Sequence, residues 1–289
     1  MDRPDVVVVG DVMVDVSVAA GQLARGGDVH GKVVVRPGGA ASNAAVWAAW
    51  AGARVRLHGR VGADLPGRLL RESLAERGVE PNLAEDPETR TGAVLAVVEG
   101  GERSMAADRG ANARMSPGDL PHRLEAGAVL LSGYLLFHPD SEPAARAALE
   151  RARAGHVAVD AASWPLVRDY GPARFLAATE SATMLLANED EARTLSPGEP
   201  EECARALSLS YRYAVLKLDG GGVTVGGPEG VATVPGRRAD PVEPTGAGDA
   251  FAGVLLARLA HGVEMEKALA DANEVAATVV GSESNWPER

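Results

Sequence analysis

The chain has little cysteine, little basic charge and no long apolar run, and each shortage excludes a class of protein. Cys203 is the only cysteine among 289 residues, so neither an internal disulfide nor a cysteine-based metal cluster can form. Acidic residues outnumber basic ones by 40 to 29, and a net charge of −11 argues against a nucleic-acid or membrane-surface partner. No stretch approaches the ~18 consecutive apolar residues of a membrane-spanning helix. The N-terminal MDRPDVVVVG lacks the features of a signal peptide, so a cytoplasmic protein is expected.

What the chain does have is enough apolar residues to bury a core, at 46%, and a regular alternation of strand-like and helix-like segments. Runs rich in β-branched residues, such as 5–10, 128–134, 156–161 and 213–218, predict buried strands. Helical patterns lie between them, at 39–52, 65–78, 142–154, 248–261 and 264–280. This order predicts an α/β fold with a mostly parallel sheet covered on both faces, in one domain over residues 1–289. Trp47 and Trp50, three residues apart in one such helix, are both expected to pack in the core.

Two regions interrupt that alternation. Residues 13–36 and 91–108 contain short strand-like runs separated by polar or glycine turns, which is typical of hairpins. Four short strands of this kind do not belong to a doubly wound sheet. They predict a small β-lid inserted beside the core, and its exposed edges make a lid-to-lid homodimer plausible.

The stretch EPTGAGDAFAG (243–253) places small and turn-forming residues directly before one carboxylate, Asp249. Gly246 and Gly248 permit backbone conformations that point successive N–H groups at one anion, and a helix beginning there adds its dipole. A carboxylate beside phosphate cannot bind it but can accept a proton from an attacking hydroxyl. An ordinary glycine turn explains the same residues, because a single glycine loop is a weak signal.

The loop resembles the C-terminal signature of the ribokinase-like (PfkB) family of carbohydrate kinases, and further motifs follow in the family's order along essentially the whole chain. They are VVVGDVMVD (7–15), the segment 36–79 beginning RPGGAASNAA, DRGAN (108–112), LLANEDEA (185–192), LKLDGGG (216–222) and DANEVAAT (271–278). The resemblance implies a ribokinase-like three-layer α/β/α fold with a small β-strand lid. It also implies ATP-dependent phosphorylation of a primary hydroxyl on a sugar or sugar derivative.

Carried over position by position, the resemblance assigns the catalytic groups. Asp249 matches the general base, and Gly246, Ala247 and Gly248 match the anion hole for the transferring phosphoryl group. Asn188 and Glu191 match an N-x-x-E element that organises Mg²⁺ and phosphate, often through water, and oxygen ligands suit Mg²⁺. Two simpler roles stay open, since Asn188 could cap a helix and Glu191 could be an exposed helical acid.

The resemblance also assigns binding residues for a small-molecule sugar or nucleoside and for ATP. The sugar-binding positions are Asp15, Gly38, Gly39 and Asn43, and their carboxylate and amide can bind vicinal hydroxyls. Arg109 could reach a charged substrate group or could be an exposed lid arginine, and Asp64 is either near the pocket or a structural cap. The nucleotide side is matched by Lys217, Gly220, Gly222 and Asn273. For Lys217 a lysine at a strand edge, without a phosphate contact, is the favoured interpretation.

Departures from the family pattern concern the acceptor more than the reaction. Glu243–Pro244 replace a common Asp-Thr that borders a monovalent-cation site, which leaves a requirement for K⁺ open. The segment 131–137 lacks the acid that ribokinases use on ribose. A nucleoside kinase and a catalytically inactive sugar-binding or regulatory relative are therefore kept as alternatives. A dinucleotide-binding oxidoreductase is disfavoured, because GDVMVD after the first strand is no G-x-G-x-x-G.

Overall fold

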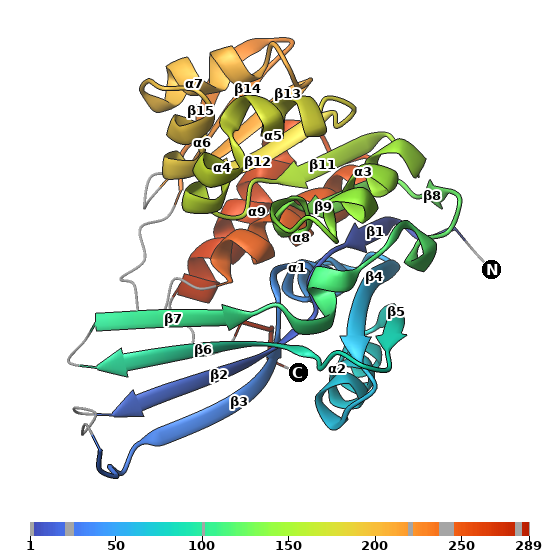
Figure 1. Cartoon of the computed structure of the whole chain (residues 1–289). Coiled ribbons are helices and arrows are strands. Elements are labelled where there is room, and N and C mark those ends of the chain that lie inside the picture. Colours follow the sequence, from blue (N-terminus) through green and yellow to red (C-terminus); the bar gives the residue numbers. More distant parts are fainter. Residues whose placement is uncertain are drawn as a thin grey trace.

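Two sheets organise the computed structural model, which describes residues 3–20, 26–99, 102–218, 222–236, 246–280 and 285–288 (Figure 1). The larger has nine strands in the order β15 (Gly230–Val234), β14 (Gly222–Gly227), β13 (Tyr213–Leu218), β12 (Met184–Asn188), β11 (His156–Asp160), β9 (Ala128–Ser132), β1 (Val6–Val9), β4 (Val55–Gly62) and β5 (Val79–Asp86). Its strands pair in parallel, except that β14 runs antiparallel to both of its neighbours. The predicted mostly parallel α/β fold is confirmed.

Helices cover both faces of this sheet and divide the core in two. α1 (Ala40–Trp50), α2 (Leu65–Glu76), α8 (Ala247–Ala260) and α9 (Met265–Val280) share one apolar cluster with Val6 and Val8. α3 (Glu142–Arg151), α4 (Trp164–Tyr170), α5 (Pro172–Ala178), α6 (Glu189–Leu195) and α7 (Pro200–Leu207) share the other with Val7 and Val9. The unbroken valine run of β1 thus serves both faces, because successive side chains of a strand point to opposite sides.

Short elements connect the layers. They are the 3₁₀ turns η1 (Gly110–Arg114), η2 (Pro117–Asp119) and η3 (Gly133–Phe137), with a two-stranded ladder of β8 (Leu124–Glu125) and β10 (Ala152–Arg153). The helix expected over 142–154 ends at Arg151, because Ala152 turns to extended backbone and pairs with Leu124. Within the described residues, no helix is both long and apolar enough to cross a membrane.

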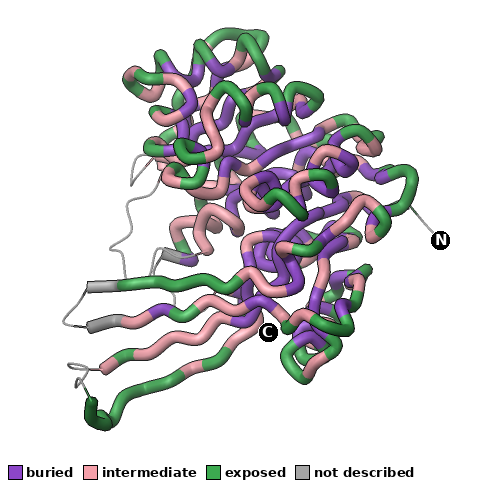
Figure 2. Tube along the Cα trace, viewed as in Figure 1, coloured by how far each residue is buried: buried purple, intermediate pink, exposed green. Residues whose placement is uncertain are grey.

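A four-stranded sheet stands apart from the core as the lid, in the order β3 (Lys32–Gly38), β2 (Met13–Ala20), β6 (Gly92–Glu99), β7 (Glu102–Asp108). The strands fall in the two regions that the hairpin patterns predict. Figure 2 shows the lid mostly intermediate or exposed, whereas the core strands are buried. In β3 the exposed Val33 and Val35 point away from the cavity-lining Arg36, as a two-residue strand period requires.

The expectation that Trp47 and Trp50 both lie in the core is wrong for Trp50. Trp47 is 5% exposed within the cluster of α1 and α8, whereas Trp50 is 53% exposed. Trp50 is the last residue of α1, after which the chain turns at Ala51, and its ring packs edge-on against Trp47. Because this end of α1 lies outside the core, its last side chain is exposed to solvent, although it lies three residues after the buried Trp47.

The approach of α1 to α8 decides how the site is built. Gly253 of α8 lies so close to α1 that an added Cβ would be 2.2 Å from the Ala44 carbonyl oxygen and 2.9 Å from the Ala48 nitrogen. Both obstacles are backbone atoms, which cannot rotate away as a side chain can. The two helices can keep this distance only with glycine at position 253.

We therefore expect Gly253→Ala to destabilise the fold by about 1–3 kcal/mol, the usual cost of overpacking a core. Urea unfolding of wild type and variant measures the difference. Gly118→Ala is the matched control, because the nearest atom to a Cβ there is a side-chain oxygen 3.5 Å away. Equal free energies of unfolding for the two variants would contradict the close contact.

Candidate active site

A cavity of about 1200 Å³ lies between the lid and the carboxyl ends of the core strands. This is the edge of a parallel sheet at which α/β proteins bind ligands. The predicted residues that line the cavity are Asp15, Gly39, Asn43, Arg109, Asn188, Glu191, Lys217, Gly222, Gly246, Ala247, Gly248, Asp249 and Asn273. The structure thus brings together residues that are far apart in the sequence.

The first turn of α8 forms the floor of this cavity. Gly246 precedes the helix with a left-handed φ of 89°, a conformation that glycine adopts without strain. Ala247, Gly248 and Asp249 follow, so that backbone N–H groups without helical partners face the cavity. A Cβ at Gly248 would lie 3.3 Å from Lys217 Nζ. Because Gly248 has no side chain, the ammonium group of Lys217 can lie close to this turn.

Asp249 is a half-buried carboxylate with one clear hydrogen-bond donor. Asn43 Nδ2 donates to Asp249 Oδ2 over 2.9 Å. Burial raises the pKa of Asp249 to about 7; the Asn43 hydrogen bond and Lys217 oppose this rise, while the charges of Asp160 and Asp15 add to it. A carboxylate with this pKa can exist in either protonation state near neutrality, as a general base must.

Asp15 and the glycine pair lie at the lid end of the cavity. An added Cβ at Gly38 would come within 2.2 Å of the Asp15 carboxylate, which explains the glycine there. Gly39, with φ of 96°, would place a Cβ 2.6 Å from the Asp11 carbonyl oxygen. Gly38 itself is buried beside the cavity, so its role is to admit the Asp15 side chain.

Asn188 and Glu191 form a reciprocal cap at the start of α6. Asn188 Oδ1 accepts from the Glu191 N–H at 2.8 Å, and Glu191 Oε2 accepts from the Asn188 N–H at 2.8 Å. The capping role open for Asn188 is confirmed, whereas an exposed Glu191 is excluded because the residue is 3% exposed. Burial and the nearby charge of Asp160 raise the pKa of Glu191 to about 7, and Lys217 opposes that rise.

Lys217 lies one residue before the end of the interior strand β13, and its ammonium group is paired. Its Nζ lies 2.9 Å from Asp160 Oδ2, and both side chains are 18% exposed. Burial alone would lower the pKa of Lys217, but the charges of Asp160 and Glu191 overcome it and raise the pKa, which keeps the ammonium charged. Lys217 is therefore a fixed cation near the carboxylates of Asp160 and Glu191. The interpretation of Lys217 as a strand-edge residue did not include these interactions.

Arg109 connects the lid to the core. Its guanidinium pairs with Asp11, which is 2% exposed, and donates to the Tyr134 carbonyl oxygen at 2.7 Å. Ser132 Oγ donates to the other Asp11 oxygen at 3.1 Å. Arg109 Nε is buried without a hydrogen-bond partner among the described groups. An exposed lid arginine is thus excluded, because the guanidinium is paired with a buried carboxylate and a backbone carbonyl.

The nucleotide side is described in part. Gly222 has φ of 94° and lies where a Cβ would be 2.2 Å from the Val234 carbonyl oxygen, so the close approach of the backbone at the end of β15 requires glycine there. Asn273 of α9 lines the cavity, and within the described chain its Nδ2 is buried without a hydrogen-bond partner. Gly220 and the departing pair Glu243–Pro244 lie outside the described residues. Asp64 caps α2 through the Gly67 N–H at 2.9 Å, and it does not line the cavity.

Sequence reasoning missed several residues of the site. Asp11 lies two residues after β1 and Asp160 is the last residue of β11, so the rule that sites form at the carboxyl ends of parallel strands could have found both. The tail residues Asn285 and Trp286 carry no comparable signal. Asn285 Nδ2 donates to Asp15 Oδ2 at 3.0 Å, and Trp286 Nε1 donates to Asn43 Oδ1 at 2.9 Å.

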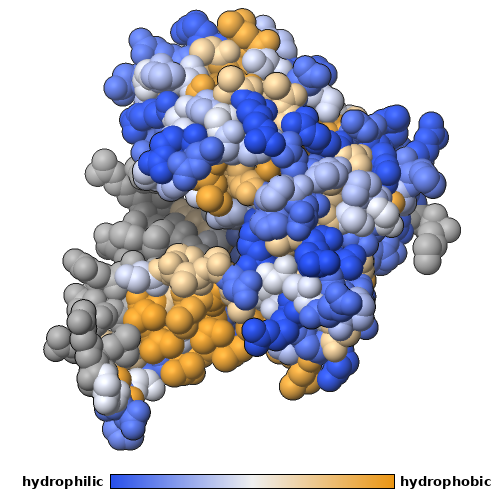
Figure 3. All heavy atoms as spheres, in the orientation of Figure 1, coloured by the Kyte–Doolittle hydropathy of each residue, from blue (hydrophilic) through white to orange (hydrophobic). Residues whose placement is uncertain are grey.

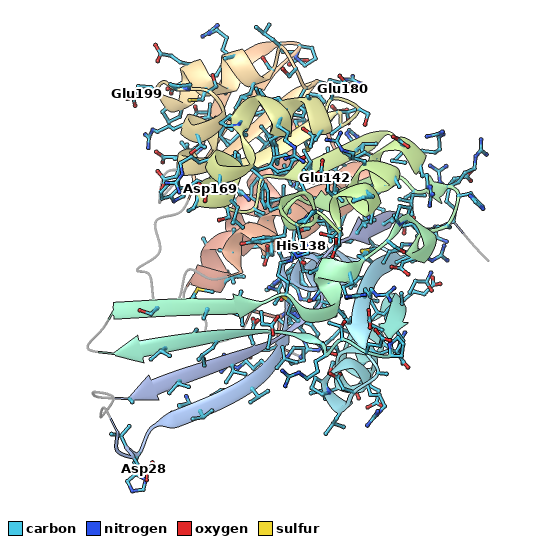
Figure 4. The ribbon with its side chains drawn as sticks, viewed as in Figure 1. Asp28, His138, Glu142, Asp169, Glu180 and Glu199 are labelled. Carbon is cyan, nitrogen blue, oxygen red and sulfur yellow. The ribbon has the colours of Figure 1, made fainter. Side chains whose placement is uncertain are left out.

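Acidic residues inside the cavity differ from those outside. Figure 4 shows Asp28 at the far end of the lid and Glu180 and Glu199 on the exterior of the core, where all three are exposed. The cavity instead concentrates half-buried or buried acids around one paired lysine. In the described part of the chain, no three His, Cys, Asp or Glu side chains converge into a group that could hold a metal by themselves. A metal here would need water or a substrate phosphate as further ligands.

Comparisons with known proteins agree with this geometry. A family model described as "pfkB family carbohydrate kinase" matches residues 3–285. A ribokinase of Bacillus subtilis is 27% identical over 99% of this chain and 97% of its own, and an aminoimidazole riboside kinase of Salmonella typhimurium is 31% identical over 78% of this chain and 74% of its own. The crystal structure of an adenosine kinase from Sinorhizobium meliloti has a TM-score of 0.89 over 100% of this chain and 97% of its own, at 23% identity.

Replacing Asp249 with Asn is expected to stabilise the fold more at pH 8 than at pH 5. The pKa of Asp249 is raised from 3.8 to about 7 in the folded state, so its folded form holds a proton that the unfolded chain releases. Stability contributed by this group is therefore lost as the pH rises from about 4 to about 7, and the amide avoids that loss. We expect the melting temperature at pH 8 to rise by about 2 °C or more. Asp28→Asn is the control, and an equal gain at both pH values would contradict the shift.

Proposed function

The chain belongs to the pfkB family of carbohydrate kinases, and from this premise we propose how its cavity transfers a phosphoryl group. It is an enzyme that phosphorylates a sugar or sugar derivative with ATP. We propose that residues 1–289 make one kinase domain with the lid inserted, that the acceptor is a primary hydroxyl, and that the enzyme acts in the cytoplasm. One observation supports the reaction above all: Asp249 stands in the first turn of α8, where free backbone N–H groups face the cavity.

Asp249 acts as the general base. Its carboxylate accepts the hydroxyl proton while the hydroxyl oxygen bonds to the γ-phosphorus of ATP, and the bond from that phosphorus to ADP breaks. Asn43 holds one carboxylate oxygen, which leaves the other for the incoming hydroxyl. The pKa near 7 supports this role, because the group binds a proton during the step and releases it afterwards.

Backbone and lysine stabilise the charge on the moving phosphoryl group. The N–H groups of Gly246, Ala247 and Gly248 form the anion hole, helped by the dipole of the 14-residue α8. Lys217 Nζ approaches this turn at Gly248 and supplies a positive charge. These groups are fixed before the substrate binds, so they need no reorganisation during the reaction.

Kinases of this family use ATP with a divalent metal ion, and we propose Mg²⁺. The residues fit it: Glu191 and Asp160 place two oxygen-ligand carboxylates at the cavity, and the raised pKa of Glu191 shows a local excess of negative charge that a cation would relieve. Both Glu191 oxygens already accept from Asn188, so Glu191 would hold the ion through water. Bound there, Mg²⁺ would neutralise phosphate charge. The K⁺ requirement stays open, since its segment lies outside the described residues.

A nucleoside acceptor is the second candidate, and the lid favours it. The cavity-facing side of the lid contains an apolar patch of Met13, Val94, Ala96, Met105 and Ala107, beside the polar Asp15, Ser17 and Arg36. Such a wall can cover a nucleobase, while Asp15 binds the ribose hydroxyls below it. The similarity to an aminoimidazole riboside kinase supports the same acceptor class.

The activity is tested with ATP, Mg²⁺ and a panel of free sugars and ribosides, following ADP release. We expect turnover to rise with pH through about 7 and then level off, because the ionised Asp249 is the active form. Asp249→Asn should lower kcat by about 10²- to 10⁴-fold, whereas the exposed Asp28→Asn should not. Wild-type kcat in Asp249→Asn would refute the base, and preference for ribosides over free sugars would decide the acceptor class.

A second copy of the chain is the proposed partner of the lid's outer face. That face exposes Val33 (60%), Val35 (57%) and Leu95 (42%), and β3 and β7 leave two free sheet edges. Figure 3 shows apolar residues gathered over the lid, whereas the core surface in that view is mostly hydrophilic. A self-complementary apolar face of this kind suits a twofold dimer.

Sedimentation of the wild-type protein should therefore show a dimer, and Val35→Glu should shift it to a monomer. Leu209→Glu is the matched control, because Leu209 is 88% exposed on the core, away from the lid. A wild-type monomer at micromolar concentration, or a dimer that persists in Val35→Glu, would contradict the lid interface.

A further inference from the structure

The C-terminal residues 285–288 fold back onto the acceptor end of the cavity. Trp286 is 7% exposed, and the guanidinium of Arg77 lies 5.6 Å from the centre of its ring. Trp47 Nε1 of α1 donates to the Asn285 carbonyl oxygen at 2.8 Å, and Arg77 also donates to the Pro287 carbonyl oxygen. Figure 1 places this end of the chain beside the base of the lid. The tail is thus held from α1 and from the end of α2.

From this position Trp286 starts a chain of two hydrogen bonds that ends on the base. Trp286 Nε1 donates to Asn43 Oδ1 at 2.9 Å, and Asn43 Nδ2 donates to Asp249 Oδ2 at 2.9 Å. An indole N–H can only donate, so it selects the oxygen end of the Asn43 amide. The NH₂ end must then face Asp249. A flipped amide would direct its oxygen at the carboxylate, which would repel it.

We propose that Trp286 is a positioning residue for Asp249: through Asn43 it fixes which end of the amide meets the base, and so orients the carboxylate and holds it ionised. The inference rests on the proposed role of Asp249 and goes beyond it, because it assigns a catalytic task to the C-terminal tail. Trp286 acts through Asn43 and forms no bond with Asp249 itself.

The charges around Asp249 make this neutral donor important. Asp15 faces it from β2, Asp160 from β11, Lys217 from β13 and the Tyr134 phenol from η3. Two carboxylates thus oppose its ionisation and one ammonium favours it. Among the neutral groups, the Asn43 amide lowers the pKa of Asp249 against the effect of burial. Losing or flipping that donor would leave less ionised base at neutral pH.

Trp286→Phe removes the indole N–H and keeps an aromatic ring beside Arg77. We expect the rise of kcat/KM with pH to move to higher pH by about half a unit to one unit, and kcat at pH 7 to fall about two- to fivefold, with recovery at pH 9. Trp50→Phe on the exposed end of α1 is the matched control. A merely structural role would lower activity equally at every pH, and that outcome would overturn the proposal.

A double-mutant cycle tests the route through Asn43. In an Asn43→Ala background, Trp286→Phe should have no further effect on kcat, because the intermediate group is absent. Additive losses would overturn the proposal. The cycle also separates an effect that passes through Asn43 from a general loosening of residues 285–288. Such a loosening would lower kcat in addition to the loss caused by Asn43→Ala.

An NMR titration reads the same chain without turnover. The Asp249 carboxyl carbon, assigned by its loss in Asp249→Asn, should titrate at higher pH in Trp286→Phe. In the wild-type enzyme the Trp286 indole N–H, one of four in the chain, should shift with the same pKa; this measurement needs no folded Trp286 variant. The proposal would be overturned if the pKa of Asp249 were the same in Trp286→Phe as in wild type, or if the chemical shift of the Trp286 indole N–H did not change with pH. Turnover retained by Asp249→Asn would instead refute the proposed base and leave the titration interpretable.

Discussion

The site depends on one close contact between helices, the approach of α1 to α8 at Gly253. Asp249 and Gly253 are four residues apart, so they share one face of α8, and Asn43 directly precedes the Ala44 whose carbonyl oxygen Gly253 meets. The absent side chain at 253 therefore sets the distance at which, one turn earlier, the Asn43 amide meets the Asp249 carboxylate at 2.9 Å. Packed helices usually lie ~8–10 Å apart, depending on the side chains between them. Larger side chains between α1 and α8 would move the Asn43 amide away from the Asp249 carboxylate.

The cavity beside that contact has few basic residues along its lining. A chain with net charge −11 has to bind the polyanion ATP, and the groups that we propose for this are backbone N–H groups and a few fixed cations rather than a basic surface. Lys217 is held by Asp160 and Arg109 by Asp11, so a carboxylate orients each of these two cations at the cavity. The charge of Asp160 helps to raise the pKa of both Asp249 and Glu191, so the acidity of these two groups depends on their shared surroundings.

Local patterns predicted the fold and many of the residues that line the cavity, because the causes of these features are local. The valine run of β1, the glycine turn before Asp249 and the reciprocal Asn188–Glu191 cap each follow from backbone geometry within a few residues. Long-range pairing is different: Asp160 finds Lys217 only once β11, β12 and β13 lie side by side. The exposure of Trp50 and the return of Trp286 to Asn43 likewise depend on where the chain turns after a helix, which residue spacing does not encode.

The groups proposed for phosphoryl transfer and those proposed to select the acceptor come from different parts of the fold. The groups that would handle the proton and the phosphoryl charge come from strand ends and from α8, whereas the apolar wall over the acceptor comes from the lid strands β2, β6 and β7. Lid strands border solvent and tolerate exchange of side chains, while the turn at Gly246–Asp249 is fixed by backbone conformation and by contact with α1. If the acceptor binds under the lid, as we propose, substitutions at residues such as Met105 would change acceptor preference without disturbing Asp249. Met105 is 57% exposed, so a larger or smaller side chain there costs little stability and alters only the space above the acceptor.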